Sequence, residues 1–160
     1  MSITWFFLFA GILLAHNAEE WIFFDRFNPG GAKGGIQVPV IRFRLALILV
    51  TLAGVALVPL KAVGLAWADR LFAGAAAIMV FNAIFPHLWL TLVFRRYTTG
   101  VVTGLLLMLP GCVAIIIAAR EAGLRPGEIA SAALLVGASV LLLLVLVMAP
   151  GLRRNPQAKR

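Results

Sequence analysis

A short polar stretch near the N-terminus carries three titratable side chains. The residues at positions 16–20 read His-Asn-Ala-Glu-Glu. On a helix, His16 is three residues from Glu19 and four from Glu20, so both carboxylates project near the imidazole. The stretch lies inside an otherwise apolar segment, 3–24, which is long enough to cross a bilayer. Each charge there costs roughly 2.5–3.5 kcal/mol on insertion scales, so the cluster predicts a functional site.

A second polar group lies in another apolar segment, 67–94, and consists of Asn82, Pro86 and His87. Pro86 has no N–H, and its ring clashes with the carbonyl four residues back, which belongs to Asn82. We therefore expect a kink at this point. A helix that breaks beside two polar side chains is expected to face the bundle interior and not lipid.

Helix geometry predicts that the two groups meet. The two segments run in the same direction, and the helical rise is about 1.5 Å per residue. The acidic pair and both imidazoles then lie about 6–12 Å from the same membrane face, whereas Asn82 lies about 18 Å deep. We expect one pocket that contains His16, Glu19, Glu20 and His87.

Three further polar residues could join this pocket. Asn17 places an amide on the same turn as the acidic pair. Thr103 would lie about 6 Å deep in the fourth segment, where it either bonds back to its own helix or orients a ligand. Tyr97 precedes it and is either an interface anchor or a member of the site.

The composition defines the class of protein. Of the 160 residues, 62% are hydrophobic, which predicts an all-α integral membrane protein with a single bundle domain, 1–152, and a short basic tail, 153–160. Cys112 is expected to be a small core residue. We predict five membrane-spanning helices, over residues 3–24, 43–62, 67–94, 100–119 and 128–149.

The loop charges predict the orientation of the chain. The net charge is +8, but the basic residues fall between apolar segments, so we expect lipid headgroups and not nucleic acid as their partners. We predict a multi-pass protein of the plasma (inner) membrane with the N-terminus outside and the C-terminus cytoplasmic. Ten of the 14 Lys and Arg residues lie on the predicted cytoplasmic side: Arg26, Lys33, Arg42, Arg44, Arg95, Arg96, Arg153, Arg154, Lys159 and Arg160.

Glycine-rich and small-residue stretches leave two questions open. The loop 28–37 contains four glycines and a proline, and it is either a flexible linker or a lid over a cytoplasm-facing cavity. The run 74–77, Gly-Ala-Ala-Ala, and Gly54 could serve packing within the chain or a homodimer.

The motif at 16–20 resembles the one that names the HXXEE family of integral membrane proteins. A second block, Asn82 to His87 followed by Arg-Arg-Tyr-Thr-Thr-Gly-Val-Val-Thr-Gly over 95–104 and by Pro110, is also similar to that family. The resemblance covers roughly residues 10–112. Thr99 departs from it, because a proline is expected before the glycine. The family has no settled activity, so the resemblance implies a membrane location and functional residues but no reaction.

A metalloenzyme is our first hypothesis for the site. His16, His87, Glu19 and Glu20 offer four ligands for a divalent cation, with zinc expected before iron. If two imidazoles and one carboxylate bind the metal, the other glutamate acts as general base in a hydrolysis. Glu19, Glu20 and Tyr97 are then the predicted catalytic groups. The depth of the site predicts a lipid or a lipid-soluble small molecule as substrate for hydrolysis or oxidation.

Three alternatives remain open from the sequence. One is a metal-free lipid isomerase, in which an imidazole and a protonated glutamate act as an acid/base pair. Another is a small transporter or proton pathway, because intramembrane Glu and His residues also serve in proton relays. The third is a structural polar network that fixes helix register through hydrogen bonds.

Overall fold

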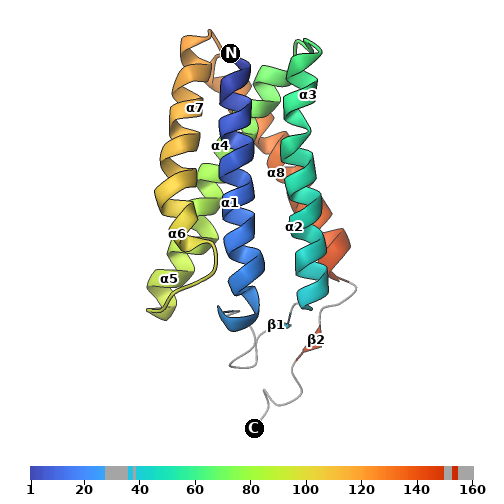
Figure 1. Cartoon of the computed structure of the whole chain (residues 1–160), viewed down its shortest axis with the longest axis vertical. Coiled ribbons are helices and arrows are strands. Elements are labelled where there is room, and N and C mark those ends of the chain that lie inside the picture. The colour runs from blue at the N-terminus through green and yellow to red at the C-terminus, as the bar shows by residue number, and fades with distance from the viewer. Residues whose placement is uncertain (28–35, 38, 150–152, 155–160) are drawn as a thin grey trace.

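The computed structural model describes residues 1–27, 36–37, 39–149 and 153–154, and over these it is a helical bundle (Figure 1). The glycine-rich stretch at 28–35 and the end of the tail, 155–160, lie outside the described residues, so the choice between linker and lid stays open. The elements are α1 (Ile3–Phe27), β1 (Ile36–Gln37), α2 (Val40–Val55), α3 (Leu57–Ala62), α4 (Ala68–Asn82), η1 (Ala83–Leu88), α5 (Trp89–Phe94), α6 (Val101–Thr103), η2 (Gly104–Met108), α7 (Leu109–Glu121), α8 (Pro126–Met148) and β2 (Arg153–Arg154).

Five helical segments among the described residues are long and apolar enough to cross a membrane, which is the pattern of a multi-pass membrane protein. Each coincides with a segment that the sequence predicts, and no end differs by more than three residues. The second span joins α2 to α3, the third joins α4, η1 and α5, and the fourth joins α6, η2 and α7. The spans are Ile3–Phe24, Val40–Ala62, Ala68–Phe94, Val101–Glu121 and Pro126–Met148.

The N-terminus and the strand β2 lie at opposite ends of the bundle (Figure 1). The N-terminus shares its end with α3 and with the turn between α7 and α8. The α5–α6 connection, the start of α2 and the strands β1 and β2 lie at the other end, where Ile36 pairs with Arg154 in antiparallel register. The described parts of the predicted basic loops thus share one end. That this end faces the cytoplasm stays a prediction.

Small and aromatic residues build the core between the helices. The rings of Phe6 and Phe72 stack with centroids 3.8 Å apart, and Cys112 is fully buried, as expected of a small core residue. A Cβ at Gly74 would lie 2.5 Å from the backbone carbonyl carbon of Ala132, so the small residues of α4 allow α8 to approach closely. The small-residue run therefore serves packing within the chain, and the homodimer stays a prediction.

The third span breaks where the sequence predicts a kink. Phe85 takes extended dihedral angles, φ −129° and ψ 116°, inside the π-helical segment η1. The proline at position 86 explains this, because the residue before a proline is driven out of the helical region. The segment η1 packs against the second π-helical segment, η2. The break places His87 on the interior of the bundle, where it is 6% exposed.

Candidate functional site

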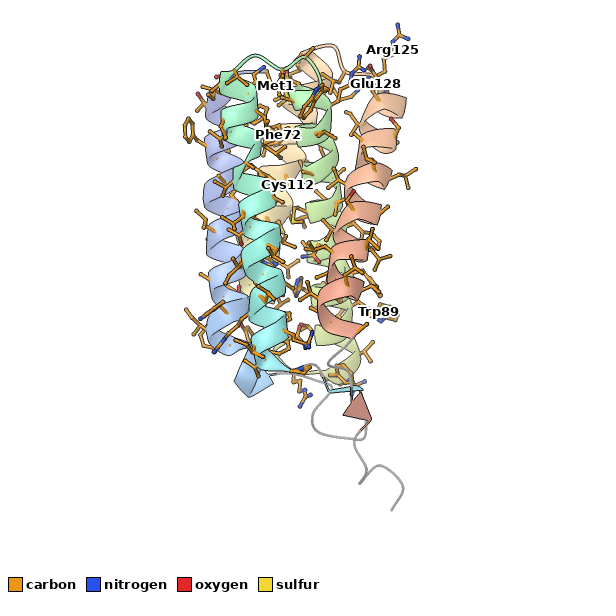
Figure 2. The ribbon with its side chains drawn as sticks, turned by 90° about the vertical axis from the view of Figure 1, so that its right-hand side faces the viewer. Met1, Phe72, Trp89, Cys112, Arg125 and Glu128 are labelled. Carbon is orange, nitrogen blue, oxygen red and sulfur yellow. The ribbon has the colours of Figure 1, made fainter. Side chains whose placement is uncertain are left out.

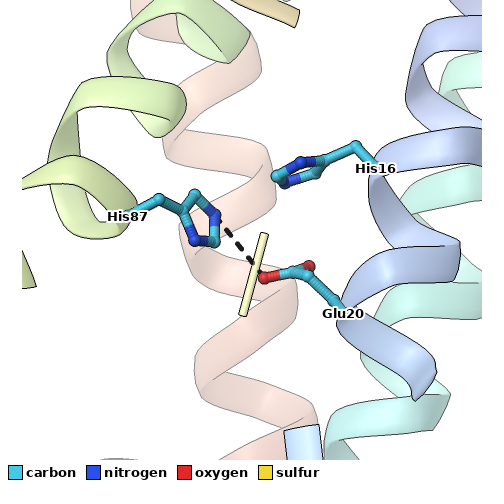
Figure 3. Close-up of side chains that lie close together, drawn as sticks. All are labelled: His16, Glu20 and His87. Atoms are coloured by element: carbon cyan, nitrogen blue, oxygen red, sulfur yellow. Dashed lines mark ion pairs between the residues drawn. The ribbon is translucent and has the colours of Figure 1, made fainter. Parts of the chain in front are cut away.

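Three titratable side chains from two distant segments meet inside the bundle (Figure 3). His16 and Glu20 lie one turn apart on α1, and His87 faces them from η1. The Nε2 atom of His87 is 3.5 Å from Oε1 of Glu20, and the two imidazole centroids are 4.9 Å apart. One potential ligand atom from each of the three lies within 4.8 Å of the others. We call these residues the triad.

A backbone hydrogen bond fixes the tautomer of His87. Its Nδ1 lies 2.6 Å from the carbonyl oxygen of Thr99. Because a carbonyl can only accept, Nδ1 carries the proton. The neutral imidazole then has its lone pair on Nε2, which faces Glu20.

The tautomer of His16 follows from a chain of two hydrogen bonds. The hydroxyl of Thr103 donates its proton to Oε2 of Glu19 at 2.5 Å, so it cannot also donate to His16. Nδ1 of His16 lies 3.0 Å from the same hydroxyl oxygen and must therefore donate to it. The lone pair of His16 is again on Nε2. The alternative in which Thr103 bonds back to its own helix is wrong, because its hydroxyl bonds Glu19.

Glu19 does not face the triad but the start of the fourth span. Its carboxylate accepts hydrogen bonds from the backbone N–H of Thr103 at 2.7 Å and of Val102 at 3.3 Å. It also accepts the hydroxyl of Thr103 and that of Tyr97, the latter at 2.5 Å. Four donors on one carboxylate are the pattern of an ionised acceptor at a helix N-terminus. The structure thus separates Glu19 from the other three predicted ligands.

Tyr97 lies in the α5–α6 connection, outside the five spans. Burial, and then the hydrogen bond to Glu19, raise the pKa of its hydroxyl above the ordinary value of 10.0. The phenol therefore keeps its proton and acts as a donor to Glu19. Of the two interpretations that the sequence leaves open, membership of the polar site is the one that this contact supports.

The two asparagines have different partners. Nδ2 of Asn82 lies 3.4 Å from Nε2 of His16 and 3.2 Å from Nε2 of His87, so this amide donates toward both lone pairs. Nδ2 of Asn17 instead bonds the hydroxyl of Thr51 at 2.5 Å and ties α1 to α2. Asn82 thus belongs with the triad, whereas the amide of Asn17 forms a hydrogen bond that joins α1 to α2.

The structure adds three residues to the site that the sequence analysis did not place in it, although they lie in the second block that resembles the family. Gly100 has φ +83°, and a Cβ there would lie 2.6 Å from Cε1 of His87 and 2.9 Å from Cε1 of His16. Thr98 donates to the backbone carbonyl of His87 at 3.0 Å. Thr99 supplies the carbonyl described above. The signal for all three is the polar run Tyr-Thr-Thr-Gly directly before an apolar span, which is typical of an ordinary loop until the histidines are placed.

The triad lines a cavity of about 240 Å³, which we call the site cavity. Its polar end is formed by the triad and the two asparagines, and its remaining walls come mainly from α2 and α8. The residues that line it are Leu13, His16, Asn17, Glu20, Phe43, Ala46, Leu47, Val50, Met79, Asn82, Pro86, His87, Val140, Leu144 and Met148.

The triad fits a divalent metal by donor type. Two imidazole Nε2 atoms and one carboxylate are a recurrent ligand set for zinc and for non-haem iron. Each imidazole is oriented through its Nδ1–H, as outer-shell partners do in metalloproteins. Tetrahedral zinc at about 2.0–2.1 Å needs donors roughly 3.3 Å apart, so the widest pair must close by roughly 1.5 Å.

Comparison with known proteins places the chain in a family. A family model described as "Protein of unknown function with HXXEE motif" matches residues 5–115. The chain belongs to this family, as the motif predicts, and the matched region contains all the polar residues described above. The helix α8 lies outside it.

One curated relative is similar over much of this region. The "Uncharacterized protein YrkK" of Bacillus subtilis (strain 168) is 37% identical over 111 residues, which are 66% of this chain and 66% of the relative. The alignment thus spans just under two thirds of the relative's length. No solved structure matches the chain. Neither description names a reaction, so the function has to be inferred from the geometry of the site.

Proposed function

We propose that this protein is a metal-dependent enzyme of the plasma (inner) membrane that acts on a lipid or a lipid-soluble small molecule. The proposed ligands are His16, Glu20 and His87. The observation that carries this proposal is the shared direction of two Nε2 lone pairs and a carboxylate, with each imidazole oriented by a hydrogen bond from Nδ1. In the structure both Nε2 atoms accept from the Asn82 amide, so a metal would take the place of this donor.

Charge balance supports a divalent cation at this place. Two neutral imidazoles and the Glu20 carboxylate contribute one negative charge. The Glu19 carboxylate, linked to His16 through Thr103, contributes a second. A divalent cation would make the whole group neutral, and buried charges are tolerated in a membrane when they are paired in this way.

The arrangement supports zinc-assisted hydrolysis. Catalytic zinc sites use three protein ligands and keep a fourth position open, and the triad offers three. Zinc supplies Lewis-acid polarisation of a substrate oxygen and activates water. Glu20 and the two imidazoles would bind the metal ion, and Thr103 and Thr99 orient the imidazoles. The apolar walls of the site cavity limit the access of bulk water. Glu19 and Tyr97 then act as positioning residues.

One observation favours a second reaction. The sequence predicts the non-ligating glutamate as general base, but Glu19 is committed to four donors on the far side of His16. Oxidation by dioxygen at a non-haem iron uses the same two-histidine, one-carboxylate ligand set and leaves positions open for dioxygen and substrate. Iron-dependent oxidation of a lipid is therefore the second candidate, and metal analysis separates the two.

Elemental analysis of the protein purified without chelators tests the proposal. We expect stoichiometric zinc, or iron for the second candidate, in the wild type. His87→Ala and Glu20→Gln should lose that metal while remaining folded by circular dichroism. Glu121→Gln, at the opposite end of the bundle, is the matched control and should retain it. Metal at trace level in wild-type protein, even after incubation with excess zinc or iron, would refute the proposal.

Activity is tested on the natural lipid mixture. The metal-loaded protein in nanodiscs is incubated with a total bacterial lipid extract, and the products are compared by mass spectrometry with those of His87→Ala. A lipid consumed only by the wild type identifies the substrate. Hydrolysis adds the elements of water to it and oxidation adds oxygen or removes hydrogen, so the mass change assigns the reaction.

A further inference from the structure

Two cavities lie end to end in the bundle. One is the site cavity, and the other, of about 330 Å³, has no member of the triad in its wall. We call it the apolar cavity. Both are lined by Leu13, Val50, Met79 and Val140, so the second begins where the first ends.

The two cavities together run along the bundle axis between α2 and α8, the helices nearest the viewer in Figure 2. The lining extends from Phe43 on α2 to Leu57 on α3, and from Met148 to Leu135 on α8. At about 1.5 Å per residue, each of these distances is about 20 Å. That is about two thirds of the roughly 30 Å hydrocarbon core of a bilayer, with the triad near one end.

The wall of the apolar cavity offers a polar ligand at most the acceptor lone pairs of one hydroxyl. Its single hydroxyl, on Ser139, donates to the carbonyl of Leu135 at 2.8 Å. A buried water needs two to four polar partners, so this wall is unsuited to ordered water and suited to hydrocarbon. Leu135 is 60% exposed, so the cavity reaches the outer surface of the bundle, from which a membrane lipid could enter between α2 and α8.

We propose that the apolar cavity binds the hydrocarbon chain of the substrate, with the polar group of the same molecule at the triad. The substrate is then a long-chain amphiphile whose reactive bond lies beside its polar end. This inference rests on the proposed function for the polar end, but the chain site itself is independent of metal. The shared lining residues carry it, because they place the apolar cavity directly beside the cavity that holds the reactive end.

Photo-crosslinking of metal-free protein in nanodiscs tests the chain site. The probe is palmitic acid that carries a diazirine at the middle of its chain, with labelled peptides identified by mass spectrometry. Ser139→Leu enlarges a side chain in the wall of the apolar cavity, and Ala138→Leu adds the same side chain at the adjacent position, which does not line the cavity, as a control. A second matched pair is Ala53→Leu, which alters the wall formed by α2, and Ala56→Leu, at a nearby position that does not line the cavity.

We expect the probe to label peptides that line the apolar cavity, with excess unlabelled palmitic acid competing. Ser139→Leu and Ala53→Leu should each reduce this labelling at least severalfold, whereas Ala138→Leu and Ala56→Leu should leave it unchanged. Labelling spread evenly over the outer faces of the helices, or equal labelling in both members of each pair, overturns the inference.

Metal content separates this inference from the proposed function. Ser139→Leu lies away from the triad and should keep the wild-type zinc content. If the wild type binds zinc but Ser139→Leu is labelled as strongly as the wild type, the chain site alone is refuted. If Ser139→Leu reduces labelling but the wild type binds no metal, the enzyme proposal is refuted and the chain site is supported.

Discussion

Gly100 provides the sharpest test of how the site is built. Its φ of +83° lies in the left-handed region, and a Cβ there would lie 2.6 Å from Cε1 and 2.8 Å from Nδ1 of His87. The same Cβ would be 2.9 Å from Cε1 of His16. Both imidazoles would have to move in Gly100→Ala, and the bond from His87 to the Thr99 carbonyl would lengthen or break.

The size of the effect can be worked out against a matched control. Gly123 has φ +93°, and a Cβ added there would meet no atom within 4 Å, so Gly123→Ala shares the backbone strain of about 1–2 kcal/mol without the clash. Gly100→Ala adds overpacking of about 1–3 kcal/mol. Its thermal midpoint should therefore lie roughly 2–12 °C below that of Gly123→Ala.

Zinc affinity is the second readout for Gly100→Ala. Disturbing the groups that orient metal ligands costs about 10–100-fold in affinity. We expect a loss of that size for Gly100→Ala and wild-type affinity for Gly123→Ala, measured by competition with a chromogenic chelator in detergent. Equal thermal midpoints for the two variants, together with unchanged zinc affinity, would refute the packing of both rings beneath Gly100.

Two further predictions concern the hydrogen bonds behind the triad. Thr103→Val removes the acceptor of His16 and should weaken zinc binding about 10–100-fold in calorimetry. Thr51→Val removes the hydroxyl that bonds Asn17 and Leu47 but no partner of either imidazole, and should leave zinc binding unchanged. An equal loss in both variants would contradict the assignment. Tyr97 is the one tyrosine of the chain, and its absorbance titration should have a midpoint above pH 10.0, which Glu19→Gln should lower. Since folding raises the pKa of Tyr97, its contribution to the free energy of unfolding is fully present below pH 10.0 and is lost as the pH rises through the folded-state pKa. A titration midpoint at or below pH 10.0 would contradict the hydrogen bond between Tyr97 and Glu19.

The sequence predicts the spans well because their signal is local. Apolar length defines each span, and Pro86 defines the kink by its missing N–H and its ring. The common depth of His16 and His87 also follows from counting residues along two helices. These properties need no knowledge of how the helices are rotated about their axes, and they are enough to place the triad at one level of the bundle.

Which of Glu19 and Glu20 faces the triad could not be predicted in this way. Adjacent residues on a helix point about 100° apart, so one must face His87 if the other does not. Which of them does depends on the rotation of α1 and on the entry of the fourth span. The structure decides it through Thr103 and Tyr97, whose donors hold Glu19 on the far side of His16.

The connection at 95–100 and the start of α6 determine the geometry of both imidazoles. His87 is oriented by a carbonyl of this connection, and His16 by Thr103 directly after it. Gly100 packs against both rings, and Tyr97 holds the glutamate that anchors Thr103. The ligand directions therefore form only when the third and fourth spans have packed on α1. Since a metal would bind this assembled form alone, bound zinc should stabilise the bundle as well as serve the proposed reaction.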